Sequence, residues 1–413
     1  MSRANGSAFR HRDFAFFWVA LLTSSFASQM ATVAVGWQVY EVRGNPLDLG
    51  LVGLAEFLPL PLLALPAGQL ADRVSRRAIY AVAVSLEIVV LLGLLMVTAR
   101  GADEVWPFFA LAFASGVAGA IGAPAGRALT PSLVPQEILL SALAQRSIAF
   151  QLSLVAGPAV GGILFAVRAE LVYAVAICIA LIALACVLAL RSGRVPAAVG
   201  AAGFGEVLAG VRLIRRTKVL LGAISLDLFA VLLGGAVALL PIFAKDILEV
   251  GPTGLGFLRT APAVGSFLAA LVIARRPISR HAGRTLFLVV ALFGASMVVF
   301  GLSRVMWLSM LALACGGAVD MVSVVLRSTI LPLVTPDEVR GRVNAVEMVF
   351  ISGSNELGAF ESGVAAALIG AVPAVVLGGV ATVVVAGVWW MLFPSLARVD
   401  RLDDLQPVGV APG

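Results

Sequence analysis

Long apolar runs alternate with short charged connectors along almost the whole chain. A helix that crosses the hydrocarbon core of a membrane needs about 20 mostly apolar residues, and each run approaches or exceeds that length. Glycine and proline interrupt several runs, which a helix bundle tolerates because neighbouring helices satisfy the freed backbone groups. The pattern predicts twelve membrane-spanning helices, at residues 15–40, 46–69, 78–99, 105–126, 137–166, 169–191, 218–243, 252–274, 284–303, 306–330, 338–369 and 372–394.

The composition supports a membrane protein, since 61% of the 413 residues are hydrophobic and only 13% are charged. Soluble domains carry roughly 25% charged residues. The net charge of +6 is spread between apolar runs, so it does not indicate a nucleic-acid partner. The cysteines and histidines lack metal-ligand spacing. We therefore expect an all-α membrane protein in a lipid bilayer, with no metal and no cofactor.

The basic residues give the orientation. If the N-terminus is inside, most arginines fall on the inner side, and Arg43, Arg100, Arg168, Lys245 and Arg304 fall on the outer side. Positive charge is retained in the cytoplasm. The sequence therefore predicts a multi-pass protein whose N- and C-termini are both cytoplasmic.

Two stretches of the chain form an internal sequence repeat. Glu137 and Glu338 stand 201 residues apart, and each follows a short turn and opens a long helix with small residues in its second half. Duplicated halves are typical of secondary transporters, whose substrate sites lie near the bilayer midplane between the repeats. The repeat predicts two pseudo-symmetric six-helix bundles. The predicted parts are an N-terminal bundle (1–191), a cytoplasmic linker (192–217), a C-terminal bundle (218–394) and a cytoplasmic tail (395–413).

The linker contains apolar residues at helical spacing, from Phe204 to Ile214, with arginines nearby. This spacing is compatible with a helix lying on the inner membrane surface. A disordered basic linker is the alternative.

Several motifs carry a resemblance to a known family. The connector Gly68–Arg77 resembles the loop between helices 2 and 3 of the major facilitator superfamily, with Ser75 in place of the usual second glycine. Residues Ser153–Gly162 resemble the helix-5 motif of its antiporters. Three further stretches resemble the subfamily that contains the enterobactin exporter and related drug exporters: Phe9–Phe14, Pro124–Leu129 and Pro336–Val343. The resemblance spans the chain and implies the major facilitator fold and transport by alternating access.

Two departures qualify the resemblance. Residues 107–122 carry no charge, whereas many drug–proton antiporters have an arginine midway along helix 4. The second-half loop Ser279–Arg284 lacks the aspartate of its first-half counterpart, so we expect the two loops to differ in chemistry.

The resemblance implies that Asp72 belongs to an inner gate, where it would bind Arg127 or the positive N-terminus of helix 11. For Arg76 and Arg77, fixing the topology is an equally good explanation. The gate candidates are Gly68, Asp72, Arg73, Arg76, Arg77, Arg127, Asp337 and Arg340. Close helix packing is expected from a second group, Ser153, Gly157, Pro158, Gly161 and Gly162.

Ionisable side chains inside the predicted spans are candidates for proton coupling, because a charge at mid-membrane usually faces a cavity or a partner. Asp227, Glu356 and Glu361 lead, followed by Asp320, Glu347 and Glu56. Glu87 is set aside, because helix 3 of the superfamily lies outside the central cavity. Asp320 and Arg327 share a helix face, so an ordinary ion pair is the alternative for Asp320.

The substrate cavity has aromatic, amide and basic candidates. Arg259 is suited either to attract an anionic substrate or to neutralise one of the acids. For the aromatic residues, packing inside the bundle is the alternative. The candidates are Phe26, Gln29, Trp37, Gln38, Phe57, Arg146 and Arg259.

These observations predict a secondary transporter of the bacterial inner membrane. We expect it to act as a monomer and to export a small amphipathic molecule, either a drug-like compound or a siderophore, in exchange for protons. A proton-coupled importer and an uncoupled facilitator stay open. An enzyme is not expected, because the chain has no nucleophile elbow and no phosphate-binding loop. A receptor would not need duplicated halves.

Overall fold

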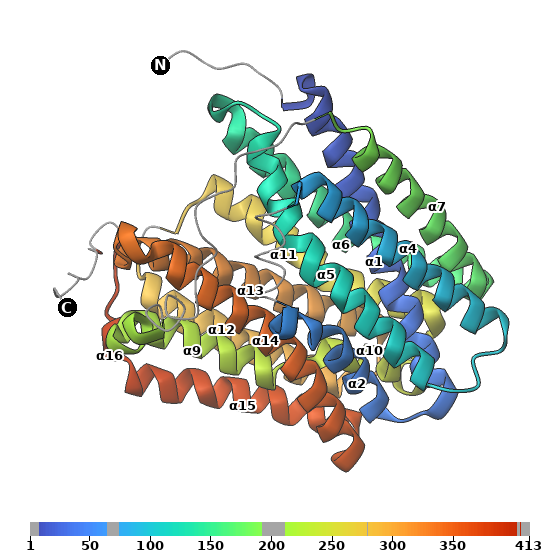
Figure 1. Cartoon of the computed structure of the whole chain (residues 1–413). Coiled ribbons are helices and arrows are strands. Elements are labelled where there is room, and N and C mark those ends of the chain that lie inside the picture. Colours follow the sequence, from blue (N-terminus) through green and yellow to red (C-terminus); the bar gives the residue numbers. More distant parts are fainter. Residues whose placement is uncertain (1–7, 64–73, 192–210, 279, 403–404, 406–413) are drawn as a thin grey trace. The chain divides into compact units, whose positions relative to one another are not determined.

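The computed structural model of the chain describes residues 8–63, 74–191, 211–278, 280–402 and 405, and every regular element among them is a helix (Figure 1). The chain divides into two compact units. Unit 1 comprises residues 1–201 and 249–260, and unit 2 comprises residues 202–248 and 261–413.

Unit 1 is built on long helices that pack side by side. α1 contacts α6 and α7, α4 contacts α5 and α7, and α2 contacts α5. The left-handed Gly44 (φ 61°) ends α1, and the side chain of Asn45 caps α2. The helices are α1 (Arg12–Arg43), α2 (Pro46–Phe57), α4 (Arg76–Ala99), α5 (Trp106–Ser132), α6 (Leu139–Val167) and α7 (Ala169–Leu188).

Unit 2 repeats the pairing of unit 1. α12 contacts α13 and α15, and α9 contacts α14 and α15, as Figure 1 shows for α9 alongside α15. The first half of α11 counts with unit 1 and its second half with unit 2. The helices from here on are α9 (Lys218–Leu233), α10 (Leu240–Ile242), α11 (Gly251–Arg275), α12 (Ala282–Leu302), α13 (Met306–Val334), α14 (Asp337–Ile369), α15 (Ala371–Leu392) and α16 (Pro394–Ala397).

Eleven helical segments among the described residues are long and apolar enough to cross a membrane. α14 is not among them, because charged and polar residues interrupt its apolar sequence along its length. Its 33 residues nevertheless span about 50 Å at 1.5 Å per residue, which exceeds a hydrocarbon core of about 30 Å. The predicted all-α membrane fold is confirmed, with the eleven segments above and α14 as the twelfth.

Glycines mark the repeat in three dimensions. Gly116 of α5 and Gly317 of α13 are 201 residues apart, and a Cβ at either position would overlap a backbone carbonyl of the helix packed against it, that of Glu56 and that of Pro262. Only glycine permits this approach. The same offset relates Gly157, against α1, to Gly358, against α9. The two halves therefore share these two close helix contacts as well as their order of helices.

This geometry gives a first testable prediction. A Gly116→Ala variant is expected to lose about 1–3 kcal/mol or more of stability, because its methyl group cannot fit against the carbonyl of Glu56. Gly119, one turn along the same helix, has nothing within 4 Å of the position that a Cβ would take. Gly119→Ala should therefore leave the unfolding temperature in detergent unchanged or raise it. Equal melting of the two variants would contradict the close contact.

The helix-5 motif also packs closely. Ser153 Oγ donates a hydrogen bond to the carbonyl of Leu22 at 3.1 Å, and a Cβ at Gly161 would lie 2.9 Å from the backbone of Met30 in α1. Gly162 faces the start of α11, where its Cβ would lie 2.5 Å from the carbonyl of Pro252. The carbonyl of Pro158 meets Gly256 in the same way.

One predicted span is not a single helix. The run 218–243 is helical to Leu233, after which a 3-10 turn (Ala236–Leu239), α10 and a π turn (Phe243–Ile247) follow. Gly234 and Gly235 weaken the helix at the break, and Pro241 lacks the N–H that a continuous helix would need. The apolar run alone did not reveal this break.

The linker is described only in part. Phe204 and the rest of residues 192–210 lie outside the described residues, and residues 211–216 are helical. Ile214 is buried against Leu220 and Ile330 of unit 2. The end of the linker is therefore part of the packed unit, and the predicted surface helix upstream stays a prediction.

Candidate coupling site

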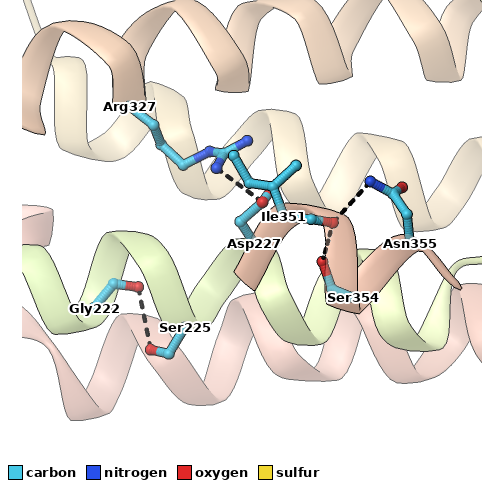
Figure 2. A network of polar contacts seen from close by, with 7 residues as sticks. All are labelled: Gly222, Ser225, Asp227, Arg327, Ile351, Ser354 and Asn355. Carbon is cyan, nitrogen blue, oxygen red and sulfur yellow. Dashed lines mark hydrogen bonds and ion pairs between the residues drawn. The ribbon is translucent and has the colours of Figure 1, made fainter. Parts of the chain in front are cut away.

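Two oppositely charged side chains meet inside unit 2. Asp227 lies in α9 and Arg327 lies in α13, and Nη1 of Arg327 is 2.8 Å from Oδ2 of Asp227 (Figure 2). Asp227 is 6% exposed and Arg327 is 5% exposed. A charge-assisted contact of this length joins the two helices, and the burial removes most of the screening by water.

Two further carboxyl groups lie within electrostatic reach of this pair. Asp320 of α13 interacts with both Asp227 and Arg327, and so does Glu347 of α14. Three acids from three helices thus interact with one arginine. If all were charged, this group of four would carry an excess of two negative charges. Such an excess is costly in a medium of low dielectric constant.

The ion pair with Asp227 does not use all the hydrogen-bond donors of Arg327. Nε of Arg327 is buried and has no hydrogen-bond partner among the described residues. A guanidinium has five N–H donors, so Arg327 keeps donor capacity for another acceptor while it binds Asp227. This capacity would allow the arginine to exchange one carboxylate for another.

The ion pair differs from the one that the sequence suggested. Asp320 and Arg327 share a face of α13, but seven residues separate their Cα atoms by about 10.5 Å along the axis. The ion pair that the structure describes joins Arg327 to Asp227, 100 positions earlier in the chain. Arg327 was not among the predicted site residues, because only the packing of α9 against α13 brings it to the acids.

The polar side chains near the pair form hydrogen bonds with backbone groups. Ser354 Oγ and Asn355 Nδ2 both donate to the carbonyl of Ile351, at 3.0 and 2.9 Å (Figure 2). On α9, Ser225 Oγ donates to the backbone and accepts from the indole of Trp389 at 2.9 Å. No hydrogen bond from these hydroxyl and amide groups to Asp227 is found among the described residues, so Arg327 is its principal partner.

The two leading candidates on α14 differ in exposure. Glu361 is exposed, and its carboxyl group forms a hydrogen bond with the neighbouring Ser362. Glu356 is half-buried. The structure thus brings Asp227, Asp320 and Glu347 together around Arg327 and leaves Glu361 outside the group.

A second acidic pair occurs in unit 1. Glu87 of α4 accepts a hydrogen bond from Ser115 of α5 at 3.0 Å, and it interacts electrostatically with Glu56 of α2. Arg259 in the first half of α11 acts on Glu56 with the opposite charge. This placement supports the neutralising role for Arg259. Glu87 is not among the proton-coupling candidates predicted from the sequence, because helix 3 of the superfamily lies outside the central cavity. Only the side-chain interactions in the structure link Glu87 to Glu56.

Gln38 makes no contact that suggests a substrate site. Its side chain is 5% exposed, and its Nε2 donates to Thr98 Oγ1 at 3.0 Å. Its Oε1 accepts from the Tyr173 hydroxyl at 2.6 Å. These bonds connect α1, α4 and α7, so the placement favours a role in packing inside unit 1.

The other predicted cavity residues are spread over unit 1. Trp37 is 7% exposed, and its ring centroid lies 6.4 Å from that of Phe165. Arg146 is half-buried and interacts with Arg127 and with the hydroxyl of Tyr80. Three more are half-buried, namely Phe26, Gln29 and Phe57.

The gate can be followed only in part. Gly68, Asp72 and Arg73 lie outside the described residues, as does the side chain of Asp337, and Arg127 is exposed. The inner gate around Asp72 therefore stays a prediction.

Three of the described gate arginines bind backbone carbonyls nearby. Arg76 Nη1 donates to the carbonyl of Ala128 at 3.1 Å, and Arg340 Nη2 donates to that of Pro332 at 3.1 Å. Arg77 donates to Val187 and Leu188, the last residues of α7. Arginine at a helix C-terminus satisfies otherwise unpaired carbonyls. These bonds favour a structural role for Arg76 and Arg77.

The sequence profile of the transmembrane secretion effectors, a family of the major facilitator superfamily, matches residues 4–408. The chain belongs to this family. The match extends over both predicted halves and over all the helices described above. This secretion-effector family member is therefore a multi-pass membrane transporter of small molecules and not an enzyme, as the sequence predicted.

Two relatives have named functions. The chain is 28% identical over 372 residues to the multidrug efflux pump Tap of Mycolicibacterium fortuitum, covering 85% of this chain and 88% of the pump. It is 26% identical over 343 residues to the enterobactin exporter EntS of Escherichia coli, covering 81% of each. Both are exporters, and they agree with the resemblance found in the sequence.

Solved structures confirm the fold of this chain. A point mutant of the nucleoside transporter NupG matches with a TM-score of 0.75 at 12% identity, over 92% of this chain and 100% of that one. A bacterial homologue of the lysosomal transporter Spinster, inward-facing and occupied, matches with 0.71 at 14% identity, over 97% and 99% of the two chains. At these identities the likeness concerns the fold alone.

Proposed function

We propose that this chain is a bacterial inner-membrane exporter that moves a small amphipathic molecule outward in exchange for protons. The proposal includes alternating access, in which the two halves move about a central site. Export is supported by the relatives, a multidrug efflux pump and an enterobactin exporter. The substrate would be a drug-like compound or a siderophore.

Proton coupling rests on one observation, the three carboxyl groups around a single arginine in unit 2. Arg327 can neutralise one carboxylate fully, so the group is most stable when it also holds a proton. An arginine cannot give up its own proton in a protein, which leaves the carboxyl groups as the proton carriers. Breaking the Asp227–Arg327 pair would change which carboxyl group holds the proton, and so would link proton binding to movement of α9 against α13.

Orientation and oligomeric state complete the proposal. We infer cytoplasmic termini from the excess of arginine in alternate connectors. The transporter would act as a monomer, with substrate and protons as its soluble partners and the lipid bilayer around it.

The test is transport by the purified full-length protein in proteoliposomes that enclose a pH-sensitive dye. Ethidium serves as the drug-like probe and enterobactin as the siderophore probe. Antiport predicts that an imposed proton gradient drives the probe across the membrane against its concentration. It also predicts that adding the probe moves protons in the opposite direction.

The alternatives give different results. A proton-coupled importer would move probe and protons in the same direction. An uncoupled facilitator would equilibrate the probe with no change in dye signal. Either result would replace the antiport proposal, whereas transport of neither probe in any arrangement would count against both proposed substrate classes.

A further inference from the structure

The second-half loop lacks an acid of its own, and so does the helix that follows it. α12 begins at Ala282 with no acidic residue in its first turn, and its N-cap residue, His281, makes no side-chain capping bond. His281 adopts a left-handed conformation with φ 58°, which is uncommon for residues other than glycine but more frequent for histidine, asparagine and aspartate than for the rest. The first N–H groups of a helix have no partner within it, so α12 needs acceptors from elsewhere.

Those acceptors come from the C-terminal segment of the chain. Oδ1 of Asp400 accepts from the backbone N–H of His281 at 2.9 Å. The carbonyl of Asp400 accepts from Ala282 at 3.1 Å, and the carbonyl of Val399 accepts from Gly283 at 2.9 Å. One carboxylate and two carbonyls thus satisfy three consecutive N–H groups, at the helix end where negative charge is favourable.

The same carboxylate meets the basic side chains of the loop. Its Oδ2 lies 4.0 Å from Nη2 of Arg280, and its Oδ1 lies 3.6 Å from Nε2 of His281. These side chains are 45–68% exposed, and exposed ion pairs contribute little. The backbone hydrogen bonds therefore carry most of the contact.

The segment is also fixed by apolar packing. Leu396 is fully buried and Val399 is 8% exposed, and both belong to a cluster with Leu286 and Phe287 of α12. A Cβ at Gly283 would overlap the carbonyl of Leu396. Glycine at this position permits the C-terminal segment to lie directly on the start of α12.

The first half solves the equivalent problem differently. There α4 is capped by Ser75, whose side chain accepts from Ala78 N–H at 3.2 Å, and the start of α4 is tied to the end of α7 through Arg77. The start of α12 is tied instead to the segment after α15 through its backbone N–H groups. In both halves the start of one helix is hydrogen-bonded to the end of the half. The donor is an arginine side chain in the first half and a set of backbone N–H groups in the second.

We propose that Asp400 takes the capping role that Ser75 has in the first half, and that this C-terminal clasp, the contact of residues 396–400 with the start of α12, is required for the transport movement of the second half. Asp400 acts as a positioning residue, since it holds the inner start of α12 to the end of the chain. The role in transport rests on the proposed function, whereas the capping of α12 does not depend on it.

Hydrogen–deuterium exchange of the full-length protein in lipid nanodiscs tests the cap. Asp400→Ala is expected to speed exchange of the amides of residues 281–283 about fivefold, the effect of losing a helix cap. Asp400→Asn retains an acceptor oxygen without the charge and should fall between Asp400→Ala and the wild type. Gly283→Ala should give at least the same acceleration by displacing Leu396, and exposed Asp103→Asn serves as the control acid.

Transport in proteoliposomes tests the positioning role with the same variants and the ethidium probe. The turnover number is expected to fall at least about threefold in Asp400→Ala and Gly283→Ala with KM unchanged, and Asp400→Glu should recover part of it. Unchanged exchange at 281–283 would overturn the clasp itself. Faster exchange with unchanged turnover would overturn its role in transport. If the wild type moves no probe, the proposed function fails while the exchange result still decides the cap.

Discussion

Replacing Arg327 with leucine is expected to abolish coupled transport and to lower stability strongly. The change leaves Asp227, Asp320 and Glu347 with no positive charge among them. Breaking a buried pair by removing one partner costs about 3–5 kcal/mol, although here the carboxyl groups can lower the cost by taking up protons. The variant should therefore be more stable at pH 5 than at pH 8 when thermal unfolding is followed in detergent.

Two further variants make this result specific. Arg275→Leu removes an exposed arginine of α11 and should leave both the melting temperature and transport near wild type. The double variant Asp227→Leu/Arg327→Leu removes both partners and should recover part of the lost stability, because an apolar pair can replace a buried ion pair. It should not recover coupled transport. If Arg327→Leu melts like Arg275→Leu at both pH values, the pair contributes nothing to the fold.

The sequence predicted the helices because their signal is local. Each apolar run extends over its own stretch of residues, and the membrane needs only a length and a composition. Even α14, which carries charges along its length, was predicted among the apolar runs, and its similarity to α6 at an offset of 201 residues agrees with that prediction. The break after Leu233 was missed, because glycine and proline inside an apolar run are compatible with either a kinked or a broken helix.

The site could be predicted only as a set of candidates. A charged residue in an apolar run indicates a partner or a cavity, but the partner is chosen by helix packing. Asp227 and Arg327 lie 100 positions apart and meet because α9 contacts α13. Gln38 illustrates the opposite case, since its amide is bound by Thr98 and Tyr173 within the packing of unit 1.

The C-terminal segment shows a third limit. The sequence revealed that the loop before α12 lacks an acid, and a cytoplasmic tail was predicted from residue 395. Nothing in the spacing of residues links position 400 to position 281. The link depends on Gly283, whose missing side chain leaves room for Leu396. A helix start without a local capping side chain is therefore a reason to search the rest of the fold for its acceptors.

Neutralising the acids that are not bound to Arg327 is expected to separate proton movement from substrate movement. Asp320→Asn and Glu347→Gln leave the Asp227–Arg327 pair in place and remove a carboxyl group that can carry the proton. The double variant should fold, bind the ethidium probe and equilibrate it across the membrane. Its proton-driven accumulation of the probe should fall at least about tenfold, because Asp227 is then the one carboxyl group of the described cluster that can still titrate.

The measurement compares accumulation under a proton gradient with exchange at equal pH on both sides. Glu170→Gln, an exposed acid at the start of α7, is the matched control and should retain both activities. Loss of exchange as well as accumulation would indicate that Asp320 and Glu347 serve the fold or the substrate. Full accumulation in the double variant would move the proton site away from Asp320 and Glu347. Asp227, and the acids Glu56 and Glu87 of unit 1, which interact across α2 and α4, would then be the carboxyl groups to replace.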